Sequence, residues 1–562
     1  MVNKIKFLAF FLCTLTTVCV SWTCKKKETQ PPIIIPTAPF SIIDNKVDSL
    51  ASKTNYFQVN TSPIIKLVFT NPVKKTSVAN SIFLNENGVT PIAINVDYTQ
   101  SDSTIIITPQ QPLKFLTRYT VAINNTLSST QNKLLTNNVT IGYITKIDTT
   151  DKFSVISDIA LLDKVQQQTL KYFWEFGHPV SGMARERNTS GDVVTTGGTG
   201  FGVMAMVTAA SRGFVPRADA ATRVLKICNF LLNNCTRYHG AFAHWVNGNN
   251  GATIPFSAND NGGDLVETAL LLQGLITARQ YFSTSDVTET DLRSKINIIY
   301  SAVEWNWYRQ NNQNVLYWHW STDKGWIINQ QISGWNEALI VYALAASAPL
   351  AVNRIPKIVY TNGWARNGAM VNNNTFYGFQ LPLGPTLGGP LFLSQYSFLG
   401  INPNGLNDTY ANYQKQVTNH TKINYEYCKA NPKRWNGYSN LCWGLTASDV
   451  PNGYSANEPN NDIGVITPTA ALSAIAFTPT ESIQALKFFY YKLGDKLWGQ
   501  YGFYDAFSLS LPWVATSYLA IDQGPIIIMI ENYRTGLLWN LFTSAPEIKT
   551  GLLALGFTAP YL

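Results

Sequence analysis

The sequence predicts two domains of different class: a small all-β sandwich, then a large all-α (α/α)6 toroid. The chain has 562 residues, more than one ordinary hydrophobic core accommodates. Apolar residues recur with period two over residues 40–148 and with helical spacing over residues 155–562. In the second region, a Gly-rich or polar turn followed by an apolar, small-residue helix occurs six times.

The N-terminus predicts export. Two lysines precede a largely apolar stretch, residues 7–20, which has signal-peptide length and is too short for a typical membrane span. Cys24 closes this segment, which favours a signal peptide over residues 1–23 and lipidation of Cys24; secretion without a lipid is the alternative. The Pro-rich residues 24–39 suit an extended tether. We expect an exported lipoprotein anchored to a bacterial membrane, the outer membrane, on its periplasmic or surface face.

Residues 40–148 contain short β-branched runs separated by Asn, Pro and Ser clusters, which is typical of an antiparallel sandwich. The alternating apolar residues include Ile65, Leu67 and Phe69, then Tyr119, Val121 and Ile123. Residues 63–69, 112–113 and 117–121 resemble the bacterial Ig-like modules of surface proteins. This region has no catalytic cluster, so we expect a spacer, with carbohydrate binding as the alternative.

The helical region alternates two kinds of segment. Six are apolar all round, and such helices are buried; they cover residues 199–210, 263–272, 334–345, 388–396, 468–475 and 523–530. Amphipathic helices, which cover buried ones, are expected near residues 215–235, 288–306, 408–430 and 479–493. The sixth outer helix comes from residues 156–176 or from the C-terminal tail. The alternative to a toroid is an irregular helical domain.

Carboxylates gather at the Gly-rich N-terminal ends of these inner segments. Asp260 and Asp264 precede the second, and Glu337 is in the first turn of the third. Asp505 and Asp522 approach the same mouth from the C-terminal side of the chain. Taken alone, Asp264 is better explained as a helix cap, because Asp is a favoured N-cap residue.

Two carboxyl groups in opposite protonation states are what glycoside hydrolysis requires, one to donate a proton and one to activate water. Clustered carboxylates raise at least one pKa, which can keep the donor protonated. A helix N-terminus favours the anion and opposes this effect. The aromatic content of 12% suits sugar stacking and also suits a large helical core.

Other chemistries have less support. The five histidines form no zinc motif, no P-loop is present, and the net charge of +8 has no basic cluster for nucleic acid. A polysaccharide lyase needs a Tyr or His base, for which His244 is the local candidate. The Cys residues after the N-terminus have no metal spacing; buried free thiols are expected, and a Cys428–Cys442 bridge is the alternative.

Several motifs, in order along residues 155–562, resemble the bacterial glycoamylase-like domain, which includes the endo-β-1,2-glucanases of glycoside hydrolase family 144. They lie at residues 182–187, 197–202, 260–268, 332–338, 468–471, 501–507, 521–525 and 531–536. The resemblance implies an inverting hydrolase with an (α/α)6 fold. It implies Glu337 as the proton donor and Asp260 or Asp264 as the base.

We therefore expect an endo-acting β-glucanase, with β-1,2-glucan as the favoured substrate, no cofactor, no metal and no nucleic-acid partner, acting as a monomer. The expected substrate contacts lie in the motifs or near the mouth: Arg185, Trp245, Trp335, Tyr504 and Asp505. The alternatives are a noncatalytic glycan-binding lipoprotein and a polysaccharide lyase on the same toroid.

Overall fold

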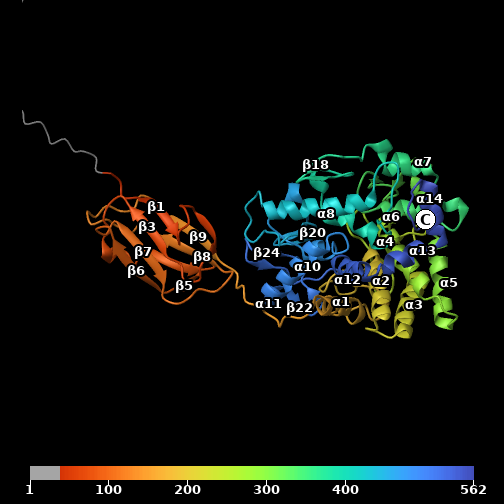
Figure 1. Ribbon diagram of the computed structural model, residues 1–562, viewed down its shortest axis with the longest axis horizontal. Coiled ribbons are helices and arrows are strands. Elements are labelled where there is room, and N and C mark those ends of the chain that lie inside the picture. Colours follow the sequence, from red (N-terminus) through yellow and green to blue (C-terminus); the bar gives the residue numbers. More distant parts are fainter. Residues whose placement is uncertain (1–37) are drawn as a thin grey trace, which may run out of the picture.

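The computed structural model describes residues 38–562. The predicted signal peptide, the lipidation site at Cys24 and residues 24–37 of the tether lie outside this part of the chain. A β-sandwich is followed by a larger, largely helical domain, and the two lie side by side along the long axis of the molecule (Figure 1). None of the helices in the described part is long and apolar enough to cross a membrane.

Two sheets form the N-terminal sandwich. Their strand orders are β1-β3-β7-β6 and β2-β9-β8-β4-β5, and only the β2–β9 pair is parallel among these neighbours. The strands are β1 (Ile42–Val47), β2 (Asn55–Val59), β3 (Ile65–Phe69), β4 (Ile82–Glu86), β5 (Thr90–Ile92), β6 (Ile94–Thr99), β7 (Thr104–Pro109), β8 (Arg118–Ile123) and β9 (Val139–Thr145). The residues predicted to alternate inward on β3 and β8 are at most 2% exposed, which confirms the period-two pattern.

The second domain has buried helices surrounded by amphipathic ones. The buried set comprises α2 (Thr196–Arg212), α4 (Leu265–Tyr281), α6 (Leu339–Ala346), α9 (Pro468–Leu472) and α12 (Ala520–Thr535). The outer set comprises α1 (Asp158–Trp174), α3 (Arg217–Asn233), α5 (Val287–Ser301), α7 (Lys357–Val359, continued by a π turn over Tyr360–Trp364), α8 (Tyr413–Ala430), α10 (Pro479–Lys487) and α11 (Gly494–Leu497). The predicted division into buried and covering helices is confirmed for the buried set and for α1, α3, α5, α8 and α10.

Neighbouring inner segments contact one another in chain order. At the α2–α4 crossing, an added Cβ on Gly274 would lie 2.1 Å from the Gly200 carbonyl oxygen, so only glycine allows this approach. The Ser397 hydroxyl receives a hydrogen bond from the first turn of α6, and Gln395 donates to a carbonyl of α9. Thr469 of α9 donates to the Asp522 carbonyl of α12, and α12 packs against α2.

The structure corrects three details of the predicted helices. Residues 388–396 do not form an α-helix; two short 3-10 helices, Leu391–Ser394 and Tyr396–Leu399, replace it after Gly388 and Gly389 at positive φ. Glu337 is outside α6, which begins at Leu339. The outer segment between α6 and the 3-10 helices is the short α7 with its π turn, which the sequence pattern did not indicate.

The C-terminal ends of the inner helices are covered by α13 (Leu537–Ser544) and α14 (Pro546–Leu555), which pack on α4 and α6. At the N-terminal ends lie short strands, among them β10 (Val193–Thr195), β11 (Phe242–Ala243), β12 (Trp245–Asn247), β14 (Gly263–Asp264), β16 (His319–Trp320), β20 (Ala447–Val450) and β21 (Gly453–Ala456). Because polar loops rather than helices cover this end, it is where a site can open.

The remaining short strands form hairpins and edges around the same domain. They are β13 (Thr253–Ile254), β15 (Leu316–Tyr317), β17 (Gln331–Ile332), β18 (Thr375–Phe376), β19 (Phe379–Gln380), β22 (Trp498–Gly499), β23 (Gly502–Phe503), β24 (Phe507–Ser508) and β25 (Trp513–Val514). The four described cysteines, Cys228, Cys235, Cys428 and Cys442, are free and buried, as expected for structural thiols.

Candidate active site

The first acid cluster consists of His244, Asp260, Asp264, Glu267 and Glu337. A three-stranded sheet, β11-β14-β16, holds its centre, and Asp264 of β14 pairs in register with Phe242 and His319 on its two sides. Since β14 leads directly into α4, the strand fixes Asp264 at the helix N-terminus.

Asp264 is fully buried, and its contacts hold both oxygens. Oδ1 accepts hydrogen bonds from the backbone N–H groups of Val266 and Glu267, both at 2.9 Å. Oδ2 lies 3.2 Å from Nδ1 of His244. Asp264 is therefore an N-cap that also orients an imidazole, which leaves little of the carboxylate for a reacting water.

His244 lies between two carboxylates. Its Nε2 is 3.9 Å from Oε1 of Glu267, on the side opposite Asp264. Burial alone would lower the pKa of His244, but Glu267, Asp264 and Asp260 outweigh it and raise the pKa to about 9. The imidazole is thus protonated at neutral pH, and it offsets part of the negative charge of the cluster.

Glu267 is anchored within the core. Its Oε2 accepts a 2.7 Å hydrogen bond from the backbone N–H of Gly197, at the start of α2. Burial raises the pKa of Glu267 above its ordinary value, against the opposing effect of His244. Glu267 thus ties α4 to α2.

Glu337 lies in the irregular segment before α6 and is the acid best suited to donate a proton. Burial raises its pKa to about 7, and the nearby Asp264 and Glu267 add to this shift. Because Glu337 lies outside the helix, the helix N-terminus does not hold its side chain as it holds Asp264. The opposition between helix dipole and burial that the sequence left open is settled in favour of burial.

Asp260 occupies the loop that precedes β14 and is largely buried. Burial, with repulsion from Asp264, raises its pKa to about 6. Its Oδ1 is buried without a hydrogen-bond donor among the described residues, although Nε2 of His319 lies 3.5 Å away. That nitrogen accepts a hydrogen bond from the backbone N–H of Gly262, so it has no proton to give Asp260. Asp260 thus keeps one oxygen for another partner.

Three residues of the cluster have the spacing of a metal site. His244, Asp260 and Asp264 each offer one ligand atom, and these atoms lie within 4.8 Å of one another. The donor set fits poorly, since a metal ligand must be a neutral imidazole and the acids raise the pKa of His244 to about 9. The arrangement is better suited to proton transfer than to metal binding.

A second acid cluster, Arg187, Asp449, Asp505 and Asp522, lies across the same end of the domain. Arg187 contacts both oxygens of Asp449 at 3.2 Å, and the Asp449 N–H donates to Oδ2 of Asp505 at 2.7 Å. Burial raises the pKa of Asp505 to about 7, and burial with repulsion from Asp505 raises the pKa of Asp522 well above its ordinary value. At neutral pH, these two carboxyl groups therefore share at least one proton.

The two clusters face a common interior. Tyr396, at the start of a 3-10 helix, is buried, which raises its pKa; Asp522 from the second cluster and Glu337 and Glu267 from the first add to the shift. Electrostatic coupling of one hydroxyl to both clusters requires that they be near neighbours. Within the first cluster, carboxylate oxygens of Asp260 and Asp264 lie within 4.8 Å of each other, and Asp264 is near enough to Glu337 to raise its pKa.

Three of the predicted substrate contacts, Trp245, Tyr504 and Asp505, remain candidates. Trp245 is partly exposed beside the first cluster, with its ring centroid 4.8 Å from Phe256 and 5.8 Å from His244. Asp505 belongs to the second cluster. Tyr504 is partly exposed and packs against Tyr518, with ring centroids 4.9 Å apart.

Two predicted contacts are corrected. Trp335 is 7% exposed and packs among Trp364, Phe398 and Tyr413, so it is a core residue without an open face for a sugar. Arg185 donates to the carbonyls of Phe176 and Gly191 and braces its own loop.

Sequence reasoning missed Arg187 and Asp449. Arg187 was in a recognised motif, where Arg185 was chosen instead; the spacing of two arginines cannot say which one points inward. Asp449 is in a short hairpin strand with no motif around it, so no local signal could have found it.

Comparison with known proteins gives matches to both domains. A family described as "Putative glucoamylase" matches residues 329–546, and one described as a bacterial Ig-like domain matches residues 43–145. An exo β-1,2-glucooligosaccharide sophorohydrolase (non-reducing end) of Parabacteroides distasonis is 43% identical over 420 residues. That match takes in 71% of this chain and 58% of the relative, so the chain spans less than two thirds of its length.

Solved structures resemble the helical domain over their whole length. A structure described as a putative glucoamylase from Bacteroides uniformis is 53% identical, with a TM-score of 0.72, and is matched over 73% of this chain and 100% of its own. The endo-β-1,2-glucanase from Chitinophaga pinensis, in complex with sophorotriose and glucose, is 47% identical with a TM-score of 0.71 and the same coverage.

Proposed function

We propose that this chain, which belongs to the glycoamylase family related to endo-β-1,2-glucanases and has an N-terminal bacterial Ig-like domain, is an exported, endo-acting, inverting β-1,2-glucanase. The observation that carries the proposal is the convergence of two buried acid clusters at one end of the inner helices, with carboxyl groups whose pKa values lie near neutrality.

Glu337 is the proposed general acid. With a pKa of about 7 it is largely protonated at mildly acidic pH and can donate to the departing glycosidic oxygen. Asp260, with a pKa of about 6, is ionised in part of the same range and has an oxygen free of protein donors. We propose Asp260 as the base that activates water, with Asp264 and His244 positioning it.

The Asp505–Asp522 pair is a second candidate for the base. Apart from the proton that the two carboxyl groups share, three of its oxygens, Oδ1 of Asp505 and both of Asp522, are buried without a hydrogen bond to the other described residues. A pair that shares a proton can accept one from water when it is singly ionised. The two candidates are separated by comparing Asp260→Asn with Asp522→Asn in the assay below.

A polysaccharide lyase is less compatible with this site. A lyase must neutralise the carboxylate of an acidic sugar beside its base. The charged groups that raise the pKa of His244, the candidate base, are all carboxylates, and they would repel such a substrate.

We further propose that the inner segments close into an (α/α)6 toroid. The support is the chain of contacts from α2 through α4, α6, the 3-10 helices, α9 and α12 back to α2. We likewise propose that the protein is exported, carries a lipid anchor at Cys24 and lies at the outer membrane, and the N-terminal sequence supports these proposals. Its monomeric state is a further proposal.

The test is to incubate purified protein with linear β-1,2-glucan and analyse the new reducing ends over time. Endo action gives a ladder of oligosaccharides early in the reaction, whereas release of sophorose alone would show exo action, as the name of the Parabacteroides distasonis relative describes. Anomeric NMR of the first products should show inversion. Lack of activity on β-1,2-glucan and on other neutral glucans would favour the noncatalytic glycan-binding alternative.

A further inference from the structure

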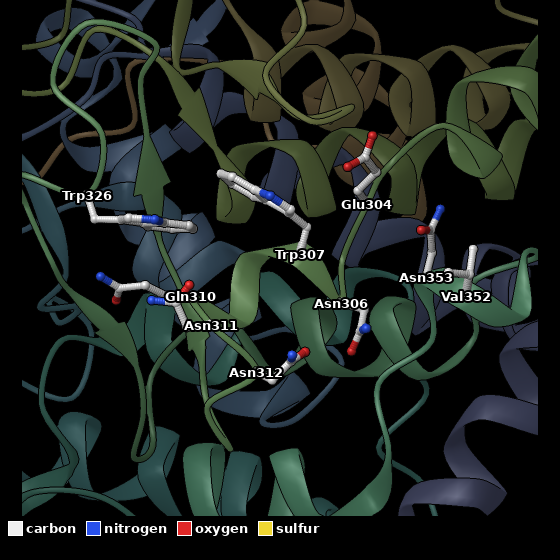
Figure 2. A pocket seen from close by; sticks show the side chains of 9 residues that line it. All are labelled: Glu304, Asn306, Trp307, Gln310, Asn311, Asn312, Trp326, Val352 and Asn353. Carbon is white, nitrogen blue, oxygen red and sulfur yellow. The ribbon is translucent and has the colours of Figure 1, made fainter.

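A polar surface pocket near the first acid cluster is not used by the proposed reaction. It encloses about 420 Å³, and the indoles of Trp307 and Trp326 lie on one side of it, with Val352 and Asn353 across from them (Figure 2). Side-chain amides make up most of the remaining lining, and Glu304 is the charged residue among the described residues that line it. Its volume lies in the range of small-molecule sites.

An aromatic column connects the pocket with the active-site sheet. His239 stacks on Trp307 with 3.5 Å between ring centroids, and Trp326 stacks with Trp307 at 4.8 Å. Trp320 meets both Trp307 and His239 edge-on at 5.0 Å. Since Trp320 is on β16, which pairs with the strand of Asp264, a ligand in the pocket would lie near the acid cluster without touching it.

The loop that forms one wall has an unusual backbone. Gln310, Asn311 and Asn312 have φ of +43°, +64° and +62°, three consecutive left-handed residues of which none is glycine. The Arg309 guanidinium holds this loop by donating to the carbonyls of Gln313 and Asn312, both at 2.8 Å. The loop is thus held in place by specific contacts despite its unfavourable conformation.

This held loop presents unused polar groups. Within the described part of the chain, the side-chain amides of Asn311 and Asn312 have no hydrogen-bond partner, and both residues are exposed. The Oε1 atom of Gln310 is buried without a partner there. Amides offer both donors and acceptors, which is what a sugar hydroxyl requires.

We propose that this pocket is a secondary, noncatalytic binding site for a neutral glucan chain; the choice of β-1,2-glucan as its ligand rests on the proposed function. The apolar face of a pyranose ring packs on the indole of Trp326, which Trp307 supports from within the column, and the sugar hydroxyls pair with the amides. No Lys or Arg side chain is among the described residues lining the pocket, and Glu304 repels anions, so the geometry selects against phosphate and uronic acid groups.

Such a site would act on polymers and not on short oligosaccharides. A chain held at the pocket keeps its remaining segments at a high effective concentration near the acid clusters. The pocket and the acid clusters share no residue, so a trisaccharide bound at the acids should gain nothing from the pocket.

Two variants test the pocket by different routes. Trp326→Ala removes one indole. Asn311→Gly combined with Asn312→Gly removes both amides, while glycine accepts the left-handed backbone. Tyr533→Ala is the control, because Tyr533 is 41% exposed on α12 and is not among the residues that line the pocket.

Binding is measured by affinity electrophoresis in gels containing linear β-1,2-glucan, with each change made in a Glu337→Gln background to prevent cleavage. Both pocket variants should bind the polymer roughly five- to tenfold more weakly, as expected for loss of one aromatic stack or two hydrogen bonds. In the active background, KM for the polymer should rise several-fold, while kcat and the hydrolysis of a trisaccharide stay unchanged.

Polymer binding and KM equal to those of Tyr533→Ala in both folded variants would overturn the proposal. The outcome is separable from that for the proposed function. If the protein cleaves β-1,2-glucan but both pocket variants bind the polymer as the control does, only the pocket proposal is rejected. If the protein does not cleave β-1,2-glucan but the glucan-containing gel retards it in a way that depends on Trp326, the proposed β-1,2-glucanase activity is rejected and the glycan-binding pocket is supported.

Discussion

Two carboxyl groups of the first acid cluster differ because their surroundings differ. Burial near two other acids raises the pKa of Glu337 to about 7. Asp260 is less buried, and the protonated His244 opposes the increase in its pKa, which reaches only about 6. The carboxylate oxygens of Asp264, by contrast, cap helix α4 and contact the imidazole of His244. These differences are the basis on which we propose donor, acceptor and positioning roles for carboxyl groups of one cluster.

Replacement of Glu337 should remove the proton donor without harming the fold. We expect Glu337→Gln to lower kcat/KM on β-1,2-glucan by about 10³-fold, since general acid catalysis contributes roughly 10² to 10⁴. The measurement is the initial rate of reducing-end formation, with Glu175→Gln, an exposed carboxylate on the same chain, as control. A residual rate within threefold of the parent would exclude Glu337 as the acid.

The pH dependence of kcat/KM should be a narrow bell. Asp260 must be ionised, so the rate falls as the pH drops below about 6; Glu337 must be protonated, so the rate falls as the pH rises above about 7. Rates measured from pH 4 to 9, with circular dichroism confirming folding at each pH, give the two limbs. A rate that stays constant to pH 9 would contradict the assignment of Glu337.

At the scale of elements, the site depends on how closely α2 and α4 approach. Glu267 of α4 reaches the N-terminus of α2 only because Gly200 and Gly274 let the two backbones meet. The same approach brings Asp264, at the start of α4, to the end of the domain where Glu337 and the second cluster lie.

A methyl group at this crossing should therefore be costly. Gly274→Ala places a Cβ 2.1 Å from a backbone oxygen that cannot move freely, and we expect a loss of about 3 kcal/mol in the free energy of unfolding. Urea denaturation measures it. Gly191→Ala is the control: its φ is +62° but the space around it is open, so about 1 kcal/mol is expected from backbone strain alone. Equal losses in the two variants would refute the packing argument.

For the whole molecule, buried acids make stability depend on pH. The folded pKa of Asp505 is above its unfolded value, so its contribution to stability is fully present below about pH 4 and is lost as the pH rises through about 7. The pKa of Asp522 is also raised well above its ordinary value, so its contribution has the same sign. Buried histidines act in the opposite direction at lower pH, as burial lowers the pKa of His420 to about 4. Comparison of the parent with a variant that differs only in the acid pair isolates the contribution of that pair to stability.

Asp505→Asn should stabilise the protein at pH 8, where the buried Asp505 is ionised, and have little effect at pH 5, because Asn is uncharged like the protonated acid. We expect a Tm several degrees above that of the parent at pH 8, measured by calorimetry at both pH values. A difference in Tm that does not change with pH would show that the pair does not share a proton. Such gains at a functional site usually cost activity.

The two domains contact each other through both apolar and polar groups. Leu116 and Ile144 of the sandwich pack into the hydrophobic core of the helical domain. Gln58 contacts Asn436, and Arg118 donates to the Ser510 carbonyl at 3.2 Å. Two relatives matched over 100% of their length correspond to only 73% of this chain, the share of the helical domain. The helical domain therefore has its own core and is expected to fold alone.

A chain restricted to residues 149–562 should keep its activity on short oligosaccharides within about twofold and its Tm within a few degrees. Thermal unfolding and the trisaccharide assay measure these quantities, and the full mature chain is the control. Aggregation or loss of the main thermal transition would show that the sandwich is part of the catalytic fold.

The sequence by itself determined the two classes of domain, most helix positions and three acids of the first cluster. The period-two alternation of the strands and the apolar, small-residue pattern of the inner helices follow from local geometry. They can therefore be recognised without knowledge of the tertiary structure. The acids could be read because they stand beside Gly-rich turns at helix starts. The failures were the short 3-10 segment after Gly388, the π turn beyond α7, and the core position of Trp335.

Only the tertiary structure decided which side chains share one interior. Arg187 rather than Arg185 reaches Asp449, and Asp522 meets Asp505, because helices and loops far apart in sequence converge on one end of the domain. Burial and charge proximity, which set the pKa of each acid, are properties of that convergence and not of local sequence. The sequence therefore supplies the reactive groups, and the fold determines which of them can hold or release a proton.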